Sequence, residues 1–358
     1  STETSAAATG SFDGQIVIGA LNSMTGPNAM TGAEQKWAYD RAVADINAAG
    51  GVDMGGKKME MVLRYIDDKS DTVEVVTAAE KLIKVEGCQI VLSSNISPGI
   101  FASATGATEK YGAYYHTVYP WVDQLRAQNY KMTSGMFFTP AIAGEVPFQV
   151  ADLMPEAERP KAWTTVMEDT ADGQGLADGI AEQAKKHNTE IKYRESFTAG
   201  TKDFSSLILK MKQNNVDAIL VLCTPTDGIT FTKQMKEQNF SPKLVYGFKG
   251  FWPNEFSTSL GPDADYVGHD GFWSEDLPYP HCKELGQQYR DEHNGQDSVA
   301  IGMSYASVQI LAEAIERAGS IDPVAVRDEV FGGTFEGTTM GDAVYAEDGT
   351  CTIPSLRA

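Results

Sequence analysis

The stretch Gln15-Ile-Val-Ile-Gly-Ala-Leu21 is a short, nearly continuous apolar run, which is what a parallel strand covered on both faces requires. A turn at Thr25-Gly-Pro27 follows it, and Thr31-Gly-Ala-Glu34 then has the spacing of a helix capping box. This spacing predicts a helix that begins near Thr31 and ends at Gly50-Gly51. A buried strand that leads into a helix is typical of an α/β protein built from βαβ units.

The same alternation of strands and helices continues along two stretches of the chain. In the first stretch, we expect strands at 59–67, 89–93 and 113–118, with helices at 72–86 and 100–111. In the second, which starts after Pro140, we expect helices at 141–153, 174–187, 203–214 and 228–239, with strands at 161–167, 190–197, 217–222 and 243–247. Such alternation predicts parallel sheets, so we expect two doubly wound, Rossmann-like α/β lobes.

The C-terminal part follows a different pattern. Helices are expected at 281–294, 302–318 and 323–331, with little strand between them, so they have no complete sheet of their own to cover. The economical arrangement returns the chain to the first lobe for these helices, with crossings near Thr139, near Gly268 and at 335–341 that form a multi-strand hinge. We therefore expect a flexible leader at 1–13, a first lobe at 14–139 plus 269–335, and a second lobe at 140–268 plus 336–358.

Length and composition agree with two globular domains. The chain has 358 residues, of which 42% are hydrophobic and 22% are charged, and a single domain usually spans about 100–200 residues. Its formal net charge is −20, spread along the sequence, which makes nucleic acid and anionic membranes poor partners. No apolar run approaches the roughly 20 residues that cross a bilayer. The N-terminal residues, Ser1 to Gly10, are small and polar, and either a leader left after processing or an ordinary frayed terminus fits them.

Several motifs of enzymes and metalloproteins are absent or imperfect. The four cysteines form no CxxC pair, which excludes zinc ribbons and dithiol redox motifs, while a disulfide between Cys282 and Cys351 stays open. The turn Gly173-Gln-Gly-Leu-Ala-Asp-Gly179 is one residue too long for a dinucleotide fingerprint, and no phosphate-binding GxxxxGK[ST] or nucleophile GxSxG sequence occurs. The five histidines lack metal-ligand spacing. We expect no cofactor, no metal and no catalytic residues.

Polar and aromatic side chains gather where the expected strands end, which is where open α/β sheets bind ligands. After the strand at 89–93, the loop that contains Ser94, Asn95 and Ser97 offers donors for a carboxylate, although simple helix capping explains it equally well. After the strand at 113–118, Tyr119 and Trp121 lie past the strand and are candidate walls of a pocket.

The second lobe offers a matching set of candidates. Asp172 precedes the glycine-rich turn, and it is either an acceptor that faces the cleft or a solvated turn residue. Thr224 follows the strand at 217–222. Lys249 and Trp252 follow the strand at 243–247, where they combine a cation with aromatic surface.

Landmarks spread over nearly the whole chain resemble the branched-chain amino-acid-binding family, the type I periplasmic binding proteins of ATP-driven uptake systems. They are Ile18-Gly-Ala-Leu-Asn-Ser-Met-Thr-Gly-Pro27, Ala44-Asp-Ile-Asn-Ala-Ala-Gly-Gly-Val52, Tyr65-Ile-Asp-Asp68, Phe197-Thr-Ala-Gly-Thr-Lys-Asp-Phe204 and Ser304-Tyr-Ala-Ser-Val308. The resemblance implies a two-lobed clamshell that closes on a small ligand, docks onto a membrane permease and works in the periplasm or outside the cell. The small polar N-terminus also fits a lipid anchor on a preceding residue.

The resemblance also implies roles for the candidate residues. It assigns the ligand's carboxylate to the loop at 94–97 and further contacts to the loop from Thr117 to Trp121. The family usually has an aromatic residue where this chain has Asp172, and an acidic residue for the ammonium where it has Lys249. A cation at Lys249 favours an anionic ligand group, whereas Asp172 keeps an amino acid among the candidates, so an aromatic or other organic carboxylate competes with it.

Two other functions fit the same fold class. One is a ligand-sensing ectodomain, which would need a signalling or transmembrane segment beyond these residues. The other is a nicotinamide-dependent enzyme that uses the turn at Gly173. We expect a solute-binding receptor that performs no chemistry on its ligand.

Overall fold

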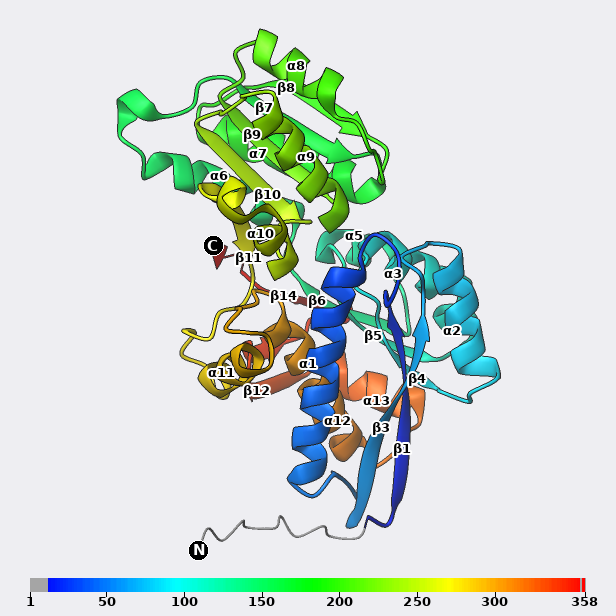
Figure 1. Cartoon of the computed structure of the whole chain (residues 1–358). Coiled ribbons are helices and arrows are strands. Elements are labelled where there is room, and N and C mark those ends of the chain that lie inside the picture. Colours follow the sequence, from blue (N-terminus) through cyan, green and yellow to red (C-terminus); the bar gives the residue numbers. More distant parts are fainter. Residues whose placement is uncertain (1–11, 355, 358) are drawn as a thin grey trace, which may run out of the picture.

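A computed structural model describes residues 12–354, 356 and 357, and shows two α/β lobes, lobe 1 and lobe 2, joined by a narrow waist (Figure 1). The leader expected at 1–13 lies almost entirely outside the described residues. Within them, the amide of Asp13 already donates to the carbonyl of Lys58 at 2.8 Å, beside the first strand.

Lobe 1 is built on a seven-stranded sheet of order β14-β6-β5-β4-β1-β3-β2. Its strands are β1 (Gly14–Asn22), β2 (Val52–Met54), β3 (Lys57–Asp67), β4 (Ile90–Leu92), β5 (Tyr114–Val118), β6 (Thr133–Phe137) and β14 (Thr350–Thr352). Its helices are α1 (Ala29–Ala48), α2 (Glu74–Lys84), α3 (Ser97–Ser103), α4 (Glu109–Tyr111), α5 (Val122–Gln128), α11 (Cys282–Glu292), α12 (Ile301–Ala318) and α13 (Pro323–Val330), with a π-helical turn at Ala104–Thr108. The hairpin of β12 (Thr334–Thr338) and β13 (Gly341–Val344) packs on it.

Lobe 2 is built on a six-stranded sheet of order β15-β11-β10-β9-β7-β8. Its strands are β7 (Trp163–Glu168), β8 (Ile191–Phe197), β9 (Ala218–Cys223), β10 (Leu244–Lys249), β11 (Val267–Gly271) and β15 (Leu356–Arg357). Its helices are α6 (Pro140–Asp152), α7 (Ala171–Lys186), α8 (Ser205–Gln213), α9 (Pro225–Glu237) and α10 (Asn254–Leu260), with 3-10 turns at Glu156–Glu158 and Gly261–Ala264.

The two lobes repeat one topology. The five consecutive parallel strands of lobe 1 run in the order β3-β1-β4-β5-β6, and those of lobe 2 run in the order β8-β7-β9-β10-β11. In each sheet the order reverses beside the first strand, and such a switch point opens a crevice at the carboxyl ends of the strands. The fold class expected from the sequence, two doubly wound lobes joined by several strands, is confirmed.

The positions of the crossings differ in part from those expected. The chain passes from lobe 1 to lobe 2 between β6 and α6, at Thr139, and returns after β11 ends at Gly271. The last crossing lies between β14 and β15 rather than at 335–341, because β14 pairs in parallel with β6 of lobe 1. Residues 336–352 therefore lie with lobe 1, and the stretch up to Gly271 lies with lobe 2.

The expected capping box at the start of α1 is wrong. The helix begins at Ala29, so Thr31 and Glu34 lie inside its first turns, and Gly32 packs so closely that a Cβ there would lie 2.1 Å from the carbonyl oxygen of Ser23. The Glu34 carboxylate is buried and accepts a hydrogen bond from Ser298 at 2.9 Å. Burial raises the pKa of Glu34 to about 8.

The four cysteines form no disulfide bonds. Cys88, Cys223, Cys282 and Cys351 are all buried free thiols, so no disulfide joins Cys282 to Cys351. Instead, the sulfur of Cys282 accepts from Trp273 and contacts the carbonyl of Thr339, both at 3.2 Å.

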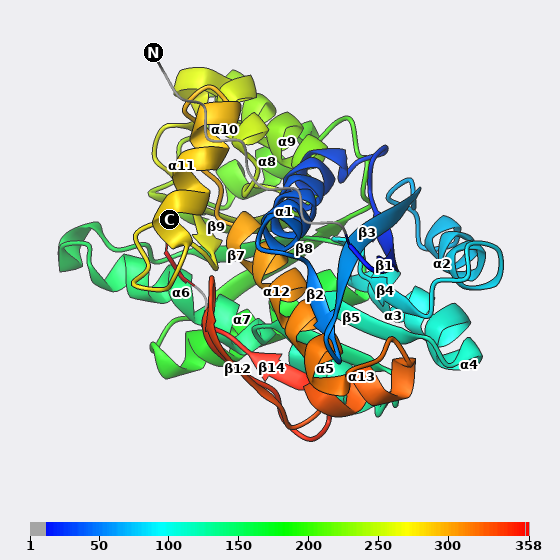
Figure 2. The same cartoon turned by 90° about the horizontal axis from the view of Figure 1, so that it is seen from below.

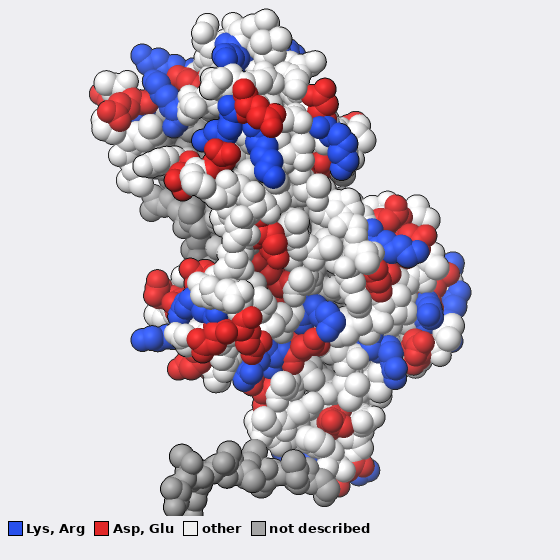
Figure 3. Space-filling view, viewed as in Figure 1, with Lys and Arg blue, Asp and Glu red and all other residues white. Residues whose placement is uncertain are grey.

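Figure 3 shows acidic and basic side chains intermixed over both lobes on the face it displays. Within the described residues, no helix has the length and apolarity to cross a bilayer.

The C-terminal helices depend on lobe 1 for their burial. Figure 2 shows α12 beside α1, and the two helices are in contact. Most of α12 is buried, including Met303, Ile310 and Leu311. A fragment of residues 141–358 would leave this surface exposed, so we expect it to show no single cooperative unfolding transition in urea, unlike the whole chain. A fragment that unfolds cooperatively with ordered α12 would contradict this arrangement.

Candidate functional site

A pocket lies between the lobes at the carboxyl ends of both sheets. Its lining residues are Asn95, Ser97, Tyr119, Trp121, Phe137, Asp172, Leu222, Phe248, Lys249, Trp252 and Asp270. Every one of them is among the last two residues of a strand or lies in the loop or first helical turn that follows one. The space between atoms is about 350 Å³ with open solvent included, but the centre of a water molecule has only about 20 Å³ of room.

Aromatic rings form most of the walls. In lobe 1, the ring of Phe137 lies 5.8 Å from Tyr119 and 5.4 Å from Trp121, centroid to centroid. Trp252 reaches across from lobe 2 to 6.3 Å from Phe137, and its indole N–H donates to Asp270 at 2.7 Å. The pocket therefore offers flat apolar surface from both lobes, fixed at one end by a hydrogen bond.

Two pocket residues have unusual backbone conformations. Tyr119 has a φ of 79° and Lys249 has a φ of 50°. Both lie in the left-handed region, which residues other than glycine rarely adopt. The Tyr119 hydroxyl is anchored 3.1 Å from the hydroxyl of Ser304 in α12. Backbone strain of this kind persists where the surroundings over-determine a position, and it is common at binding sites.

The charged groups sit on the lobe 2 side. Lys249 donates to the Glu168 carboxylate at 2.5 Å, and both side chains are largely buried. Asp172, in the first turn of α7, is only 4% exposed, and its Oδ1 has no hydrogen-bond partner within the residues that the structure describes. Because Glu168 already neutralises Lys249, the Asp172 carboxylate leaves the pocket with excess negative charge.

The pKa values follow from this arrangement. Burial raises the pKa of Asp172 to about 6; the charge of Lys249 and the nearby indole N–H of Trp121 oppose the shift, and the charge of Glu168 adds to it. Burial would lower the pKa of Lys249, but the carboxylates of Glu168 and Asp172 outweigh it and raise that pKa above its ordinary value. Lys249 is therefore a charged, paired group at neutral pH.

The structure brings most of the sequence candidates together. Asn95, Ser97, Tyr119, Trp121, Asp172, Lys249 and Trp252 all line the pocket. The sequence did not predict that Lys249 has Glu168 as a partner.

Three candidates lie outside the lining and use their hydroxyls within the protein. Thr117 donates to the carbonyl of Ser134 at 2.6 Å, and Thr224 caps α9 by accepting from the amide of Asp227. The Ser94 hydroxyl donates to Asp68.

Sequence reasoning missed the lining residues Phe137, Leu222, Phe248 and Asp270. Each of them ends or nearly ends a strand. Leu222 belongs to an apolar strand in which the sequence gives no sign of which residue reaches the pocket. Phe248 lies in the aromatic stretch from Phe248 to Trp252 that follows the expected strand at 243–247, but only Lys249 and Trp252 of that stretch were predicted as contacts. The strands of Phe137 and Asp270, β6 and β11, were expected only as unspecified parts of the hinge near Thr139 and Gly268, without residue ranges.

The glycines at 173–179, which were predicted to form a turn, lie inside α7 and allow close packing. A Cβ on Gly173 would lie 2.1 Å from the carbonyl oxygen of Glu168, and one on Gly179 would lie 2.6 Å from the backbone of Pro140 in α6. These close approaches explain why glycines occupy these positions, so a nucleotide-binding role is not needed to explain them. Within residues 12–354, 356 and 357, no group of acidic, histidine or cysteine side chains has the arrangement of a metal site.

Comparison with known proteins agrees with this geometry. The sequence model described as periplasmic binding protein matches residues 15–355, which is nearly the whole chain. The chain belongs to the periplasmic binding protein family. It is of the type I, branched-chain amino-acid-binding kind, as the resemblance implied. Proteins of this family are extracytoplasmic solute-binding proteins.

The relatives of this periplasmic binding protein differ in ligand. It is 26% identical to the Leu/Ile/Val-binding protein homolog 3 of Brucella melitensis over 95% of this chain and 90% of that protein. It shares its fold with the isoleucine complex of the LivJ binding protein of Streptococcus pneumoniae, at a TM-score of 0.81, 24% identity, and coverage of 96% of this chain and 95% of that one. A Rhodopseudomonas palustris solute-binding protein in complex with 3,4-dihydroxybenzoic acid matches at a TM-score of 0.80, 19% identity, and coverage of 96% and 92%.

The buried carboxylate of Asp172, whose Oδ1 has no partner among the described residues, should cost this binding protein stability. Its raised pKa means that the folded state holds the proton more tightly than the unfolded state, so the stability present below about pH 4 is lost as the pH rises through about 6. We expect Asp172→Asn to stabilise the ligand-free protein by on the order of 1–3 kcal/mol at pH 7.5, and by progressively less toward pH 4.

Urea unfolding at several pH values measures this effect. Asp169→Asn is the control, because Asp169 is exposed in the loop that precedes α7. A stability gain that does not change with pH would contradict the assignment of the shifted pKa to Asp172.

Proposed function

We propose that the chain is the solute-binding receptor of an ABC uptake system, and that it closes on a zwitterionic amino acid with an apolar side chain and delivers it to a membrane permease. Its family and the isoleucine complex of a structural neighbour support the transport role. The ligand class rests on the pocket of this chain itself.

The observation that carries the proposal is the unpartnered carboxylate oxygen of Asp172 in the pocket. A buried carboxylate is costly unless a donor or a cation meets it. Lys249 does not meet this need alone, because it is bonded to Glu168. A ligand ammonium at Asp172 would neutralise the excess charge.

The rest of the pocket fits the other parts of an amino acid. Asn95 and Ser97, on the lobe 1 side, offer amide and hydroxyl donors to a carboxylate. The rings of Tyr119, Trp121 and Trp252 offer apolar surface to a side chain. The donors in lobe 1 match the carboxylate of an amino acid, and the acceptor in lobe 2 matches its ammonium group.

The tightness of the pocket implies that the lobes separate for ligand entry. The volume that the centres of water molecules can occupy in the pocket is about 20 Å³, which is enough for a water molecule or two but too small for an amino acid. The walls come from both lobes, and the chain passes between the lobes at three crossings, so a hinge movement opens them.

A carboxylate without an ammonium is the second candidate. The aromatic walls and Lys249 favour it, and the neighbour that holds 3,4-dihydroxybenzoic acid shows that the fold accepts such a ligand. The two candidates differ in what they require of Asp172.

The pH dependence of binding separates these candidates. If an ammonium pairs with Asp172, the affinity for L-isoleucine should fall as the pH drops through about 6, by up to about tenfold per pH unit, because the protonated acid is neutral. Calorimetry from pH 8 to pH 5 measures it. Asp172→Asn should bind weakly with no such slope, and an affinity of the wild type that stays flat or rises toward pH 5 would exclude the ammonium contact.

Removal of the Glu168 charge should shift the preference of the pocket. In Glu168→Gln, the charge of Lys249 is no longer neutralised, so we expect L-isoleucine to bind about tenfold more weakly and 3,4-dihydroxybenzoate more tightly than in the wild type. Glu195→Gln is the matched control, since Glu195 pairs with Lys210 at 2.6 Å in the same lobe outside the pocket. Equal effects of the two variants would show that the Glu168 charge has no role in selection.

A further inference from the structure

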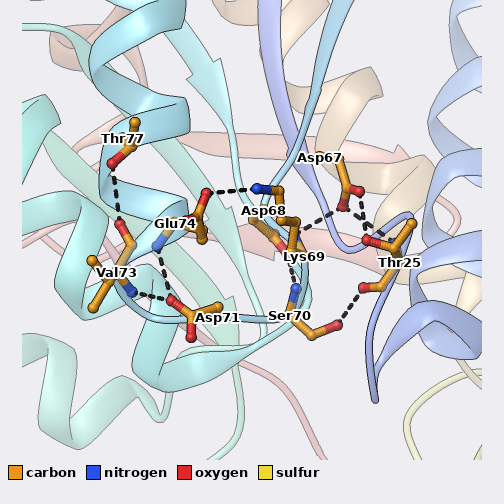
Figure 4. Close-up of polar contacts among 9 residues, drawn as sticks. All are labelled: Thr25, Asp67, Asp68, Lys69, Ser70, Asp71, Val73, Glu74 and Thr77. Carbon is orange, nitrogen blue, oxygen red and sulfur yellow. Dashed lines mark hydrogen bonds and ion pairs between the residues drawn. The ribbon is translucent and has the colours of Figure 1, made fainter.

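The loop that follows β3 holds a buried carboxylate that lies outside the pocket. Asp68 is fully buried and accepts three hydrogen bonds. Its donors are the hydroxyl of Ser23 at 2.7 Å, the amide of Ser70 at 2.8 Å and the hydroxyl of Ser94. Figure 4 shows Asp68 in this loop, with Asp67 and Thr25 on one side and Asp71 on the other.

The three donors come from three neighbouring strands. Ser23 follows β1, Ser70 follows β3 and Ser94 follows β4, and the sheet order β4-β1-β3 places these strands side by side. The Asp68 carboxylate therefore joins the loops at the switch point of lobe 1, where the topology opens its crevice.

The bonds form a closed circuit that includes a pocket residue. Asn95, next to Ser94, donates its side-chain amide to the carbonyl of Asn28 at 3.2 Å. The amide of Asn28 donates to the hydroxyl of Ser70 at 3.1 Å, and the amide of Ser70 donates to Asp68. Asn95 is thus held from both sides, through its own side chain and through its neighbour.

We propose that Asp68 is a positioning residue, which holds the loop with Asn95 and Ser97 in its ligand-binding conformation before the ligand arrives. This inference rests on the proposed function, because it concerns the donors assigned to the ligand's carboxylate. A loop that is ordered in advance does not lose conformational entropy on binding, which improves affinity.

We call Asp68 with its donors Ser23, Ser70 and Ser94 the clamp. Its chemistry also fixes the direction of the hydrogen bonds. Burial raises the pKa of Asp68, and its three hydrogen-bond donors oppose that shift. In its ionised form the carboxylate is an acceptor only, so both serine hydroxyls then point their protons at Asp68. Ser94 then has no proton left for a ligand's carboxylate. Its part is to anchor Asn95, and the direct donors are Asn95 and Ser97.

The adjacent Asp67 supplies a matched control. Its carboxylate also joins two loops, since it accepts from the amides of Met24, Thr25 and Lys69 at 2.9–3.2 Å and from the hydroxyl of Thr25 at 2.7 Å. No hydrogen bond joins it to the loop of Ser94 within the residues that the structure describes. The same substitution at the two positions separates general loop stability from the clamp.

Calorimetry with L-isoleucine tests the role through a double-mutant cycle. We expect Asp68→Asn to weaken binding about tenfold or more, and Asp67→Asn by less than about threefold. In the Ser94→Ala background, Asp68→Asn should cost less than about threefold more, because its effect passes through Ser94. Equal losses for Asp67→Asn and Asp68→Asn, or additive losses in the cycle, would overturn the proposal.

Hydrogen exchange on the ligand-free protein gives a second, ligand-independent readout. Asp68→Asn should speed amide exchange at 94–97 by about tenfold or more relative to Asp67→Asn, while β7 and α7 of lobe 2 keep the wild-type rates. Unchanged exchange at 94–97 overturns the clamp whatever the ligand is. If the wild type fails to bind L-isoleucine, the proposed ligand fails, and the exchange result still decides the role of Asp68.

Discussion

The pocket depends on one constraint, which is that a parallel sheet covered by helices has few places for polar groups other than the ends of its strands. Both sheets of this protein are built mainly from such strands, and β4, β5, β7 and β9 are buried along their whole length. The side chains with chemistry therefore gather in the loops at the carboxyl ends. The three crossings bring the carboxyl ends of the two sheets together, so each lobe supplies half of one pocket.

Two buried carboxylates at these ends illustrate how surroundings assign roles. Asp68 receives three donors from its own lobe, which leaves it satisfied and structural. Asp172 has a free oxygen in the pocket and a pKa raised to about 6, so it is the group that a ligand can still satisfy. Full satisfaction favours rigidity, and an unmet bond favours recognition.

The sequence predicts the fold better than the site because most strands have a recognisable local pattern of apolar residues. Runs such as Ala218–Cys223 are apolar throughout, whereas β6 (Thr133–Phe137) starts with small and polar residues and β14 has only three residues. These strands exist because neighbours pair with them, and no local pattern shows that. The same limit hides the partner of Lys249, since Glu168 lies 81 residues away and meets it only because β7 and β10 flank β9.

The division of the pocket between the lobes suggests an order of events in the proposed complex. Lobe 1 presents donors whose loop is already held, so a carboxylate can dock there without reorganisation. Closure then brings the ligand to Asp172, whose desolvation is unfavourable unless a cation meets it. A ligand that lacks the ammonium still docks on lobe 1 but gains little from closure. In this scheme the selectivity lies in the closing step, because lobe 1 recognises a group that many solutes carry and lobe 2 tests for the charge that separates an amino acid from a simple acid.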